Sequence, residues 1–253
     1  MTASLYYSRF TPSAWSATST KSGYSASNAG STGIARPWAS NVLTDEQLIA
    51  DLGSSQTVRA VCVQSCPVST LDVRADNSAT PTTSRGAITP AQAGHGVYRG
   101  SRAMNASVRY VSAFFASPTL LGATAGAYSR EPAVYEVGAL YAFGSVLTLP
   151  TEPLIDSEID FEYPQQTEKL PNGQQIVVSR GAPVATITLR FRPSASHVIE
   201  QVARIARAGI TWLDLGVTAR PDLQWPVRFV DDAHGRQFRG GRDVVTLRFR
   251  EVT

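Results

Sequence analysis

The chain has 253 residues, of which 43% are hydrophobic and 17% are charged. This length fits one large β domain or two modest ones, and the charged fraction lies below the usual quarter of a globular chain. The formal net charge of +3 is a mild basic excess without the dense Lys/Arg stripe of nucleic-acid-binding proteins. We therefore expect no nucleic-acid partner.

Neither the N-terminal segment 1–10 nor any later window carries a targeting or membrane signal. Residues 1–10 contain no apolar segment of signal-peptide type, and no window reaches the ~18 apolar residues of a membrane span. We expect a protein that is made in the cytoplasm and has no membrane span.

The two cysteines, Cys62 and Cys66, are spaced one residue too far apart for a Cys-x-x-Cys motif, and no second pair exists. On one strand their Cα atoms would lie about 13 Å apart at ~3.3 Å per residue. A disulfide tolerates no more than about 7 Å. We predict two unbonded, buried thiols.

The first part of the chain is rich in Ser, Thr, Ala and Gly and shows short apolar runs between turn signals. Many short strands with such punctuation indicate a sandwich or jelly roll over residues 1–147. Only Thr44–Ala50 is ambiguous, because it also fits a helix. The predicted strands are Gln47–Asp51, Val58–Gln64, Leu71–Ala75, Val108–Ala116 and Tyr135–Phe143.

Pro150 and Pro153 mark an extended connector, since proline fixes φ and withholds an amide donor. The predicted boundary therefore lies between residues 1–147 and 148–253. Beyond it, strict alternation of apolar and polar residues predicts half-buried strands. These are Ile159–Tyr163, Pro183–Arg192 and Val245–Arg250. Further strands are expected at Ile210–Leu215 and Trp225–Val230.

One amphipathic helix is expected in the second part. Val198, Ile199, Val202, Ile205 and Ala206 form an apolar stripe at helical spacing, and Gly209 provides a C-terminal stop. The predicted fold class is therefore mainly β: an N-terminal jelly-roll sandwich, and a small C-terminal α+β domain in which one helix covers an antiparallel sheet.

No catalytic constellation stands out. The three histidines are His95, His197 and His234, and only His234 has nearby acids, in Asp231-Asp232-Ala233-His234-Gly235. That cluster could hold a metal, but a hairpin turn explains it more simply. No nucleophile elbow, phosphate-binding loop or His-Glu-x-x-His motif occurs. We expect no enzyme activity, no cofactor and no metal.

An acidic row and two arginine rows are the candidate subunit interface. Asp156, Glu158, Asp160 and Glu162 alternate along one strand face, which indicates a solvent-facing or interface-facing edge; carboxylates of a glycosidase are the alternative. Arginine is favoured at interfaces. We expect the acids of one subunit to meet the arginines of the next, namely Arg190, Arg192, Arg248 and Arg250.

Several segments, in order, resemble the discoidin or coagulation-factor C-type domain, a jelly roll of the galactose-binding-like class. The matching segments are Asn28-Ala29, Arg36–Ser40, Asp45–Gly53, Val58–Val61, Val108–Val111 and Tyr135–Gly144. The resemblance covers most of residues 1–146. The disulfide that usually joins the domain ends in extracellular members has no counterpart here.

Members of that family bind glycans or lipids through loops at one end of the domain. The resemblance implies a candidate ligand loop at Trp15 and Tyr24, whereas Trp38 is expected in the core. A cell-surface glycan is therefore a candidate partner.

The second part is similar to the C-terminal parts of tailed-bacteriophage tail-tip proteins. The similarity rests on the order of an acidic strand, a Thr-x-Leu-x-Phe strand, a helix, a further strand and a final Leu-Arg-Phe-Arg-Glu. It implies a distal-tail or baseplate subunit, located in the virion tail, that forms a homo-oligomeric ring with other tail proteins. A stand-alone carbohydrate-binding module is the alternative, and a glycosidase accessory or weak hydrolase is a third reading.

Overall fold

A computed structural model of the chain describes the larger part of its residues. These are residues 3–31, 37–92, 97–116, 134–149, 157–163, 165–169, 175–179, 184–191, 202, 205, 209–216, 222–230, 236–239 and 242–252. For residues 165–169, 175–179, 236–239 and 242–245 only the backbone is described.

The described elements are strands and one short 3-10 helix. The first ten strands are β1 (Ser4–Arg9), β2 (Ala14–Ala17), β3 (Trp38–Ala39), β4 (Glu46–Gln64), β5 (Leu71–Asp76), β6 (Ser84–Ile88), β7 (Ala91–Gln92), β8 (Tyr98–Phe115), β9 (Glu136–Val137) and β10 (Ala139–Thr148), with the 3-10 helix η1 (Ala26–Gly30). The remaining strands are β11 (Glu158–Glu162), β12 (Gln165–Lys169), β13 (Gln175–Ser179), β14 (Val184–Phe191), β15 (Thr211–Asp214), β16 (Gln224–Phe229), β17 (Arg236–Arg239) and β18 (Arg242–Glu251).

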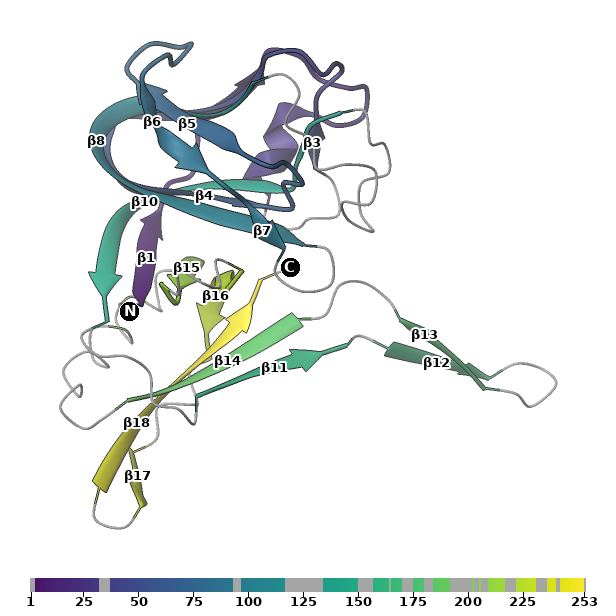
Figure 1. Cartoon of the computed structure of the whole chain (residues 1–253), viewed down its shortest axis with the longest axis vertical. Helices are drawn as coiled ribbons and strands as arrows, with labels where there is room; N and C mark the ends of the chain where they lie inside the picture. Colours follow the sequence, from purple (N-terminus) through teal and green to yellow (C-terminus); the bar gives the residue numbers. More distant parts are fainter. Residues whose placement is uncertain are drawn as a thin grey trace.

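The predicted mainly β fold class is confirmed. We call β1–β10 the first lobe and β11–β18 the second lobe (Figure 1). The division at residue 147 stays a prediction, but the expectation that no sheet crosses it is wrong. Strand β1 pairs with β10 on one side and with β15 on the other, so Leu5 faces both Leu147 and Leu213. One large sheet therefore runs through both lobes.

Two strands of the first lobe are much longer than the sequence indicates. The segments Gln47–Asp51 and Val58–Gln64 belong to one 19-residue strand, β4, and β8 begins at Tyr98, ten residues before the predicted start. Gly53, at φ +81, lies where the register of β4 and β8 shifts. Gly53 and Ser54, whose composition is typical of a turn, form part of a β-bulge instead. A bulge bends a strand without ending it. Figure 1 shows the resulting curve of β8.

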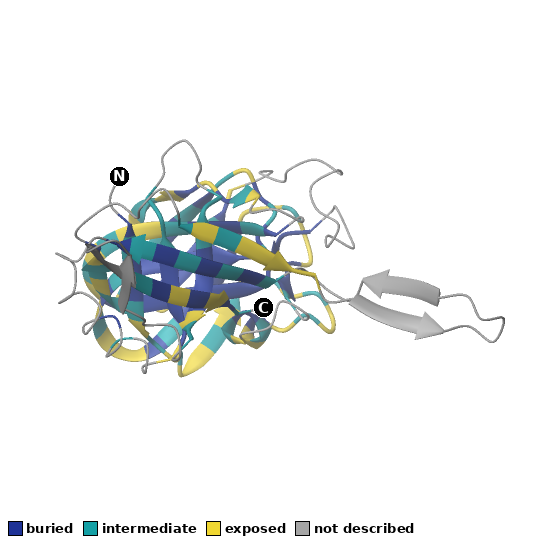
Figure 2. Cartoon of the chain, turned by 90° about the horizontal axis from the view of Figure 1, so that it is seen from below, coloured by how far each residue is buried: buried dark blue, intermediate teal, exposed yellow. Residues whose placement is uncertain are grey.

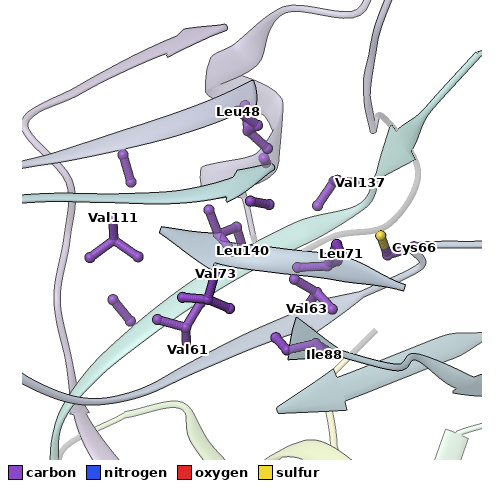
Figure 3. Packing of buried hydrophobic residues seen from close by; sticks show 14 of the residues in the cluster. Leu48, Val61, Val63, Cys66, Leu71, Val73, Ile88, Val111, Val137 and Leu140 are labelled. Carbon is purple, nitrogen blue, oxygen red and sulfur yellow. The ribbon is translucent and has the colours of Figure 1, made fainter. Parts of the chain in front are cut away.

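That bend lets β4 serve two layers. Its first half pairs with β2 at Leu48–Asp51, and its last residues pair with β10 at Ala60–Gln64. The apolar side chains of β4, β5, β6, β8 and β10 converge between these layers (Figure 3). Trp38 is fully buried in this core, as expected, and stacks on Phe115 with ring centroids 5.9 Å apart.

The alternation predicted for the second lobe is present in β14 and in residues 246–250 of β18, but not in the burial of β11. In β14 every second residue is buried, namely Ala185, Ile187, Leu189 and Phe191. The same chequered pattern is visible along the strands in Figure 2. The buried side chains form a second core with Leu247, Phe249 and Trp225. The helical residues Val202 and Ile205 pack against it, while the rest of the predicted helix lies outside the described residues.

Strands β12 and β13 form a hairpin that stands apart from the large sheet. They pair with each other from Gln165↔Ser179 to Lys169↔Gln175, as a separate two-stranded sheet. In Figure 1 the hairpin extends to one side, beyond the end of β11. The part of the chain that the structure describes offers this hairpin no third strand.

Candidate functional site

The acidic row and the arginine rows lie on the same exposed face of the second lobe. Register places Asp160 opposite Thr186, Thr186 opposite Arg250, and Arg250 opposite Arg228. Residues directly opposite each other on neighbouring strands point to the same side of a sheet. We call this the charged sheet face, made by Glu158, Asp160, Glu162, Arg190, Arg228, Arg248 and Arg250.

Within one chain, this face already pairs an acid with an arginine. Arg250 Nη2 lies 2.9 Å from Glu162 Oε2, and both side chains are more than half exposed. The two rows were expected on separate surfaces that meet between subunits. The structure instead places them two strands apart in one sheet, because β18 pairs with β14, which pairs with β11. The role of these residues in an interface stays a prediction.

Several candidate residues lie outside the described residues. These are Asp156 and Arg192 of the predicted interface, the three histidines His95, His197 and His234, and the acidic turn Asp231-Asp232. In the part of the chain that the structure does describe, no group of three or more histidine, cysteine or acidic side chains could hold a metal ion. Across those same residues, no helix has the length and apolar character to cross a membrane.

The structure separates the two aromatic residues of the candidate ligand loop. Trp15 lies in strand β2, half-buried, and packs so closely on η1 that a Cβ at Gly30 would lie 2.7 Å from its Nε1. Its position is that of a packing residue. Tyr24 does lie in a loop, half-buried, with Lys21 Nζ 5.8 Å from its ring centroid.

The Tyr24 loop is held by a buried carboxylate. Glu46, at the start of β4, is 1% exposed and accepts hydrogen bonds from the backbone N–H and the hydroxyl of Ser19. The Ser19 hydroxyl in turn accepts from the Asn41 N–H. The exposed hydroxyls of Ser25 and Ser27 lie 2.9 Å apart beside Tyr24. This arrangement presents an aromatic ring and two hydroxyl groups on a fixed loop.

A buried ion pair that was not predicted from the sequence joins the two lobes. Arg99, in β8, pairs with Glu251, in β18, and their side chains are 3% and 1% exposed. Glu251 also accepts a hydrogen bond from the Ala185 N–H at 2.9 Å. Burial lowers the pKa of Arg99 to about 9. The partners are 152 positions apart, and no local pattern reveals such a contact.

Aromatic and polar side chains fill the rest of the seam between the lobes. Trp212 of β15 lies against Tyr141 of β10, with ring centroids 6.1 Å apart. Ser101 donates to Asp214 at 3.3 Å. Burial raises the pKa of Tyr6 and of Tyr141 to about 12, so both phenols are neutral at physiological pH. The seam therefore combines the buried ion pair with packed aromatic and polar side chains.

The prediction of two unbonded thiols is confirmed. Cys62 and Cys66 are both free and fully buried. Burial raises the pKa of both thiols. A buried thiol that stays protonated is a poor nucleophile and a poor metal ligand, so neither cysteine belongs to a reactive site.

The hairpin emerges next to the last strand of the large sheet. β11 is the terminal strand in the sheet order and pairs with β14. Two large apolar side chains lie at its end, Phe161 at 41% and Tyr163 at 48% exposure. The hairpin was not predicted, although Asn172-Gly173 between its strands is a strong sequence signal for one.

No protein-family model matches the sequence, and no curated protein matches it. Among solved structures, chitosan-binding module 1 of a chitosanase/glucanase from Paenibacillus sp. IK-5, in a mutant form, is 22% identical with a TM-score of 0.43. The match covers 55% of this chain and 99% of the module.

Two further matches are of the same kind. Chitosan-binding module 2 of that enzyme, in complex with chitotriose, is 17% identical with a TM-score of 0.42, covering 53% of this chain and 98% of the module. The lectin domain of Lectinolysin, complexed with Lewis B antigen, is 16% identical with a TM-score of 0.40, covering 52% and 92%. These neighbours are carbohydrate-binding and lectin domains. The similarity to tail-tip proteins has no counterpart among them and stays a prediction.

Proposed function

We propose that this protein is a non-catalytic subunit of a homo-oligomeric assembly. The observation that carries the proposal is the β12–β13 hairpin, which stands apart from the large sheet. A lone two-stranded hairpin is marginally stable in water, and it gains stability from a third strand or from packing. We propose that a second copy of the chain, which is always present in a solution of the purified protein, contributes this third strand or packing surface. Because the second part resembles tail-tip proteins, we propose that this assembly is part of a bacteriophage tail.

Native mass spectrometry of the full chain tests this proposal. We expect a closed oligomer of defined size, because unlike surfaces that meet head to tail close into rings. Replacing residues 165–179 by a short Gly-Ser linker should give a folded monomer. A wild-type protein that stays monomeric at about 100 µM contradicts the proposal. Turnover of a glycan or ester at enzyme-like rates contradicts its non-catalytic part.

Glycan binding by the first lobe is the second candidate function. The specific observation is the Tyr24 loop, in which the half-buried Tyr24 is followed by Ser25 and Ser27, whose exposed hydroxyls lie 2.9 Å apart. An aromatic ring has an apolar face that can stack on a sugar ring, and hydroxyls can exchange hydrogen bonds with those of the sugar. The lobe would then attach an assembly to a cell-surface glycan.

A glycan array followed by calorimetry tests this second candidate. Tyr24→Ala should weaken binding of a retained glycan at least about tenfold, the loss of roughly 1.4 kcal/mol. Tyr163→Ala, an exposed tyrosine of the second lobe, is the matched control and should bind normally. Retention of no glycan, or equal binding by both variants, argues against the site.

A further inference from the structure

Among the described strands, none pairs with the outer edge of β11, the terminal strand of the large sheet. We infer that the β12–β13 hairpin of one copy adds to the β11 edge of the next copy, in an inference that rests on the proposed assembly. Addition of an extended segment to a terminal strand is a common mode of protein recognition, in which main-chain hydrogen bonds give the affinity.

Charge explains why β11 takes a hairpin and not another β11. Glu158, Asp160 and Glu162 are exposed along this strand. Pairing of two β11 strands from different copies would set three carboxylates against three others, and like charges directly opposite each other destabilise a sheet. The hairpin segment 165–179 contains one acid, Glu168, and one base, Lys169. It is therefore neutral and meets no such repulsion.

The opposite end of the large sheet is a poorer acceptor. The terminal strand there is β6, whose pairing with β5 shifts register between Val73 and Arg74. Gly86, within β6, has φ +106, and a Cβ on it would lie 2.4 Å from Arg102. Bulges and long charged side chains are devices that protect a sheet edge from strand addition. Of the two terminal strands of the large sheet, β11 is therefore the better acceptor for an added strand.

The position of the exposed apolar residues agrees with this assignment. Phe161 lies in β11 and Tyr163 directly follows its last residue, where the chain leaves toward the hairpin. The sequence of β13 contains the run Ile176-Val177-Val178, so added strands would bring β-branched residues next to aromatic ones. Pairs of this type stabilise neighbouring strands. Because hairpin and edge are different surfaces, the contact is head to tail and extends to a ring.

Cysteine cross-linking between two differently tagged copies tests the contact. One copy carries Asp160→Cys. The other carries one cysteine in the hairpin, at Gln166, Thr167, Glu168, Ile176, Val177 or Val178, so that either strand and either face can meet β11. Cys62 and Cys66 are buried and free and give no background. A disulfide requires Cα atoms within about 7 Å, so a linked heterodimer reports direct contact.

We expect at least one hairpin position to link to Asp160→Cys several-fold more than to the control, Ser84→Cys on β6. If the wild-type protein assembles but no hairpin position links above the control, the β11 contact is wrong and the proposed assembly stands. If the wild-type protein is monomeric in native mass spectrometry, both the β11 contact and the proposed assembly are wrong. Linking to Ser84→Cys in place of Asp160→Cys would move the contact to β6 and overturn the inference.

Discussion

Arg99 and Glu251 are the residues on which the seam between the lobes depends most. Their ion pair is buried on both sides, and removing one partner of such a pair leaves a buried charge without compensation. A buried ion pair need not stabilise the fold relative to a pair of apolar residues, but loss of either partner alone is strongly destabilising. The neighbouring Arg99 Nε and Gln64 Nε2 have no hydrogen-bond partner among the described residues, so little else there can compensate a lost charge.

Substitution of Arg99 by methionine should therefore lower the free energy of unfolding by about 3–5 kcal/mol. The double variant Arg99→Met/Glu251→Gln should recover most of that loss, since no uncompensated charge remains. The control is Arg109→Met, which breaks an ion pair with a half-exposed arginine and should lower the free energy of unfolding far less than Arg99→Met. Urea denaturation measures all three. Equal losses for Arg99→Met and Arg109→Met would contradict the buried position of the seam pair.

Asp51 gives the first lobe a pH dependence of known sign. Its carboxylate accepts two 2.9 Å hydrogen bonds from Arg109 and a third from the Gly53 N–H. Hydrogen bonding by Arg109 lowers the pKa of Asp51 below its usual range. A carboxylate with a lowered pKa stabilises the fold above its unfolded-state pKa of about 3.9, and this contribution is lost as the pH falls through the folded-state value.

Asp51→Asn should thus lower the urea midpoint at pH 7 and have a smaller effect near pH 2, because protonation of the wild-type carboxyl removes its contribution as the pH falls. The comparison of wild type and variant at both pH values is the measurement. A difference that stays constant from pH 7 to pH 2 would show that the carboxylate charge is not the cause.

At the scale of elements, the clean alternation of β11, β14 and β18 was enough to predict their position within a few residues. In β14 and in residues 246–250 of β18 buried and less buried side chains alternate, so sequence pattern and environment agree, whereas β11 alternates in sequence but has no buried residue. The full length of β4 was not predicted, because Gly53-Ser54-Ser55 has the composition of a turn and divided the strand into two. Whether such a segment ends a strand or bends it depends on a partner strand far away in the chain, here β8.

The bulge at Gly53 is a testable feature of this element. Gly53→Ala should lower the free energy of unfolding by about 1–2 kcal/mol, because φ of +81 is unfavourable for a residue with a Cβ. Steric overlap adds little, as the nearest atom, Ser13 Oγ, would lie 3.4 Å away. Gly53→Asn should cost less, since asparagine adopts positive φ more readily. Thermal unfolding of the two variants gives the comparison; a larger loss for asparagine would exclude the backbone explanation.

At the scale of the whole molecule, the candidate site and the link between the lobes were the least accessible from sequence. Among the described members of the acidic and arginine rows, Asp160 and Arg250 are exposed as predicted, but the face they share depends on the strand order β11–β14–β18. The composition shift and Pro150 suggested two separate modules, whereas β1 contributes Leu5 and Ala3 to the second core. Pairing between strands far apart in the chain, such as β1 with β15 at Ser4↔Asp214, cannot be recognised from local sequence patterns.

Strand β1 is hydrogen-bonded to β10 of the first lobe and to β15 of the second. The two cores should therefore unfold together. Leu5 is 1% exposed in the second core and lies between Leu147 and Leu213. Leu5→Ala should cost about 2–5 kcal/mol, the range for a buried leucine. It should shift the unfolding of Trp38 in the first core and of Trp225 in the second by the same amount.

Fluorescence of variants that retain one of these two tryptophans, with the others changed to phenylalanine, measures the transition of each core in urea. Coincident midpoints in the wild type and in Leu5→Ala are expected, as for a single cooperative unit. Val146→Ala, at a 42% exposed position on β10, is the control and should change stability by less than about 0.5 kcal/mol. If Leu5→Ala shifts only the Trp225 transition, the lobes are energetically separate and β1 connects them without coupling them.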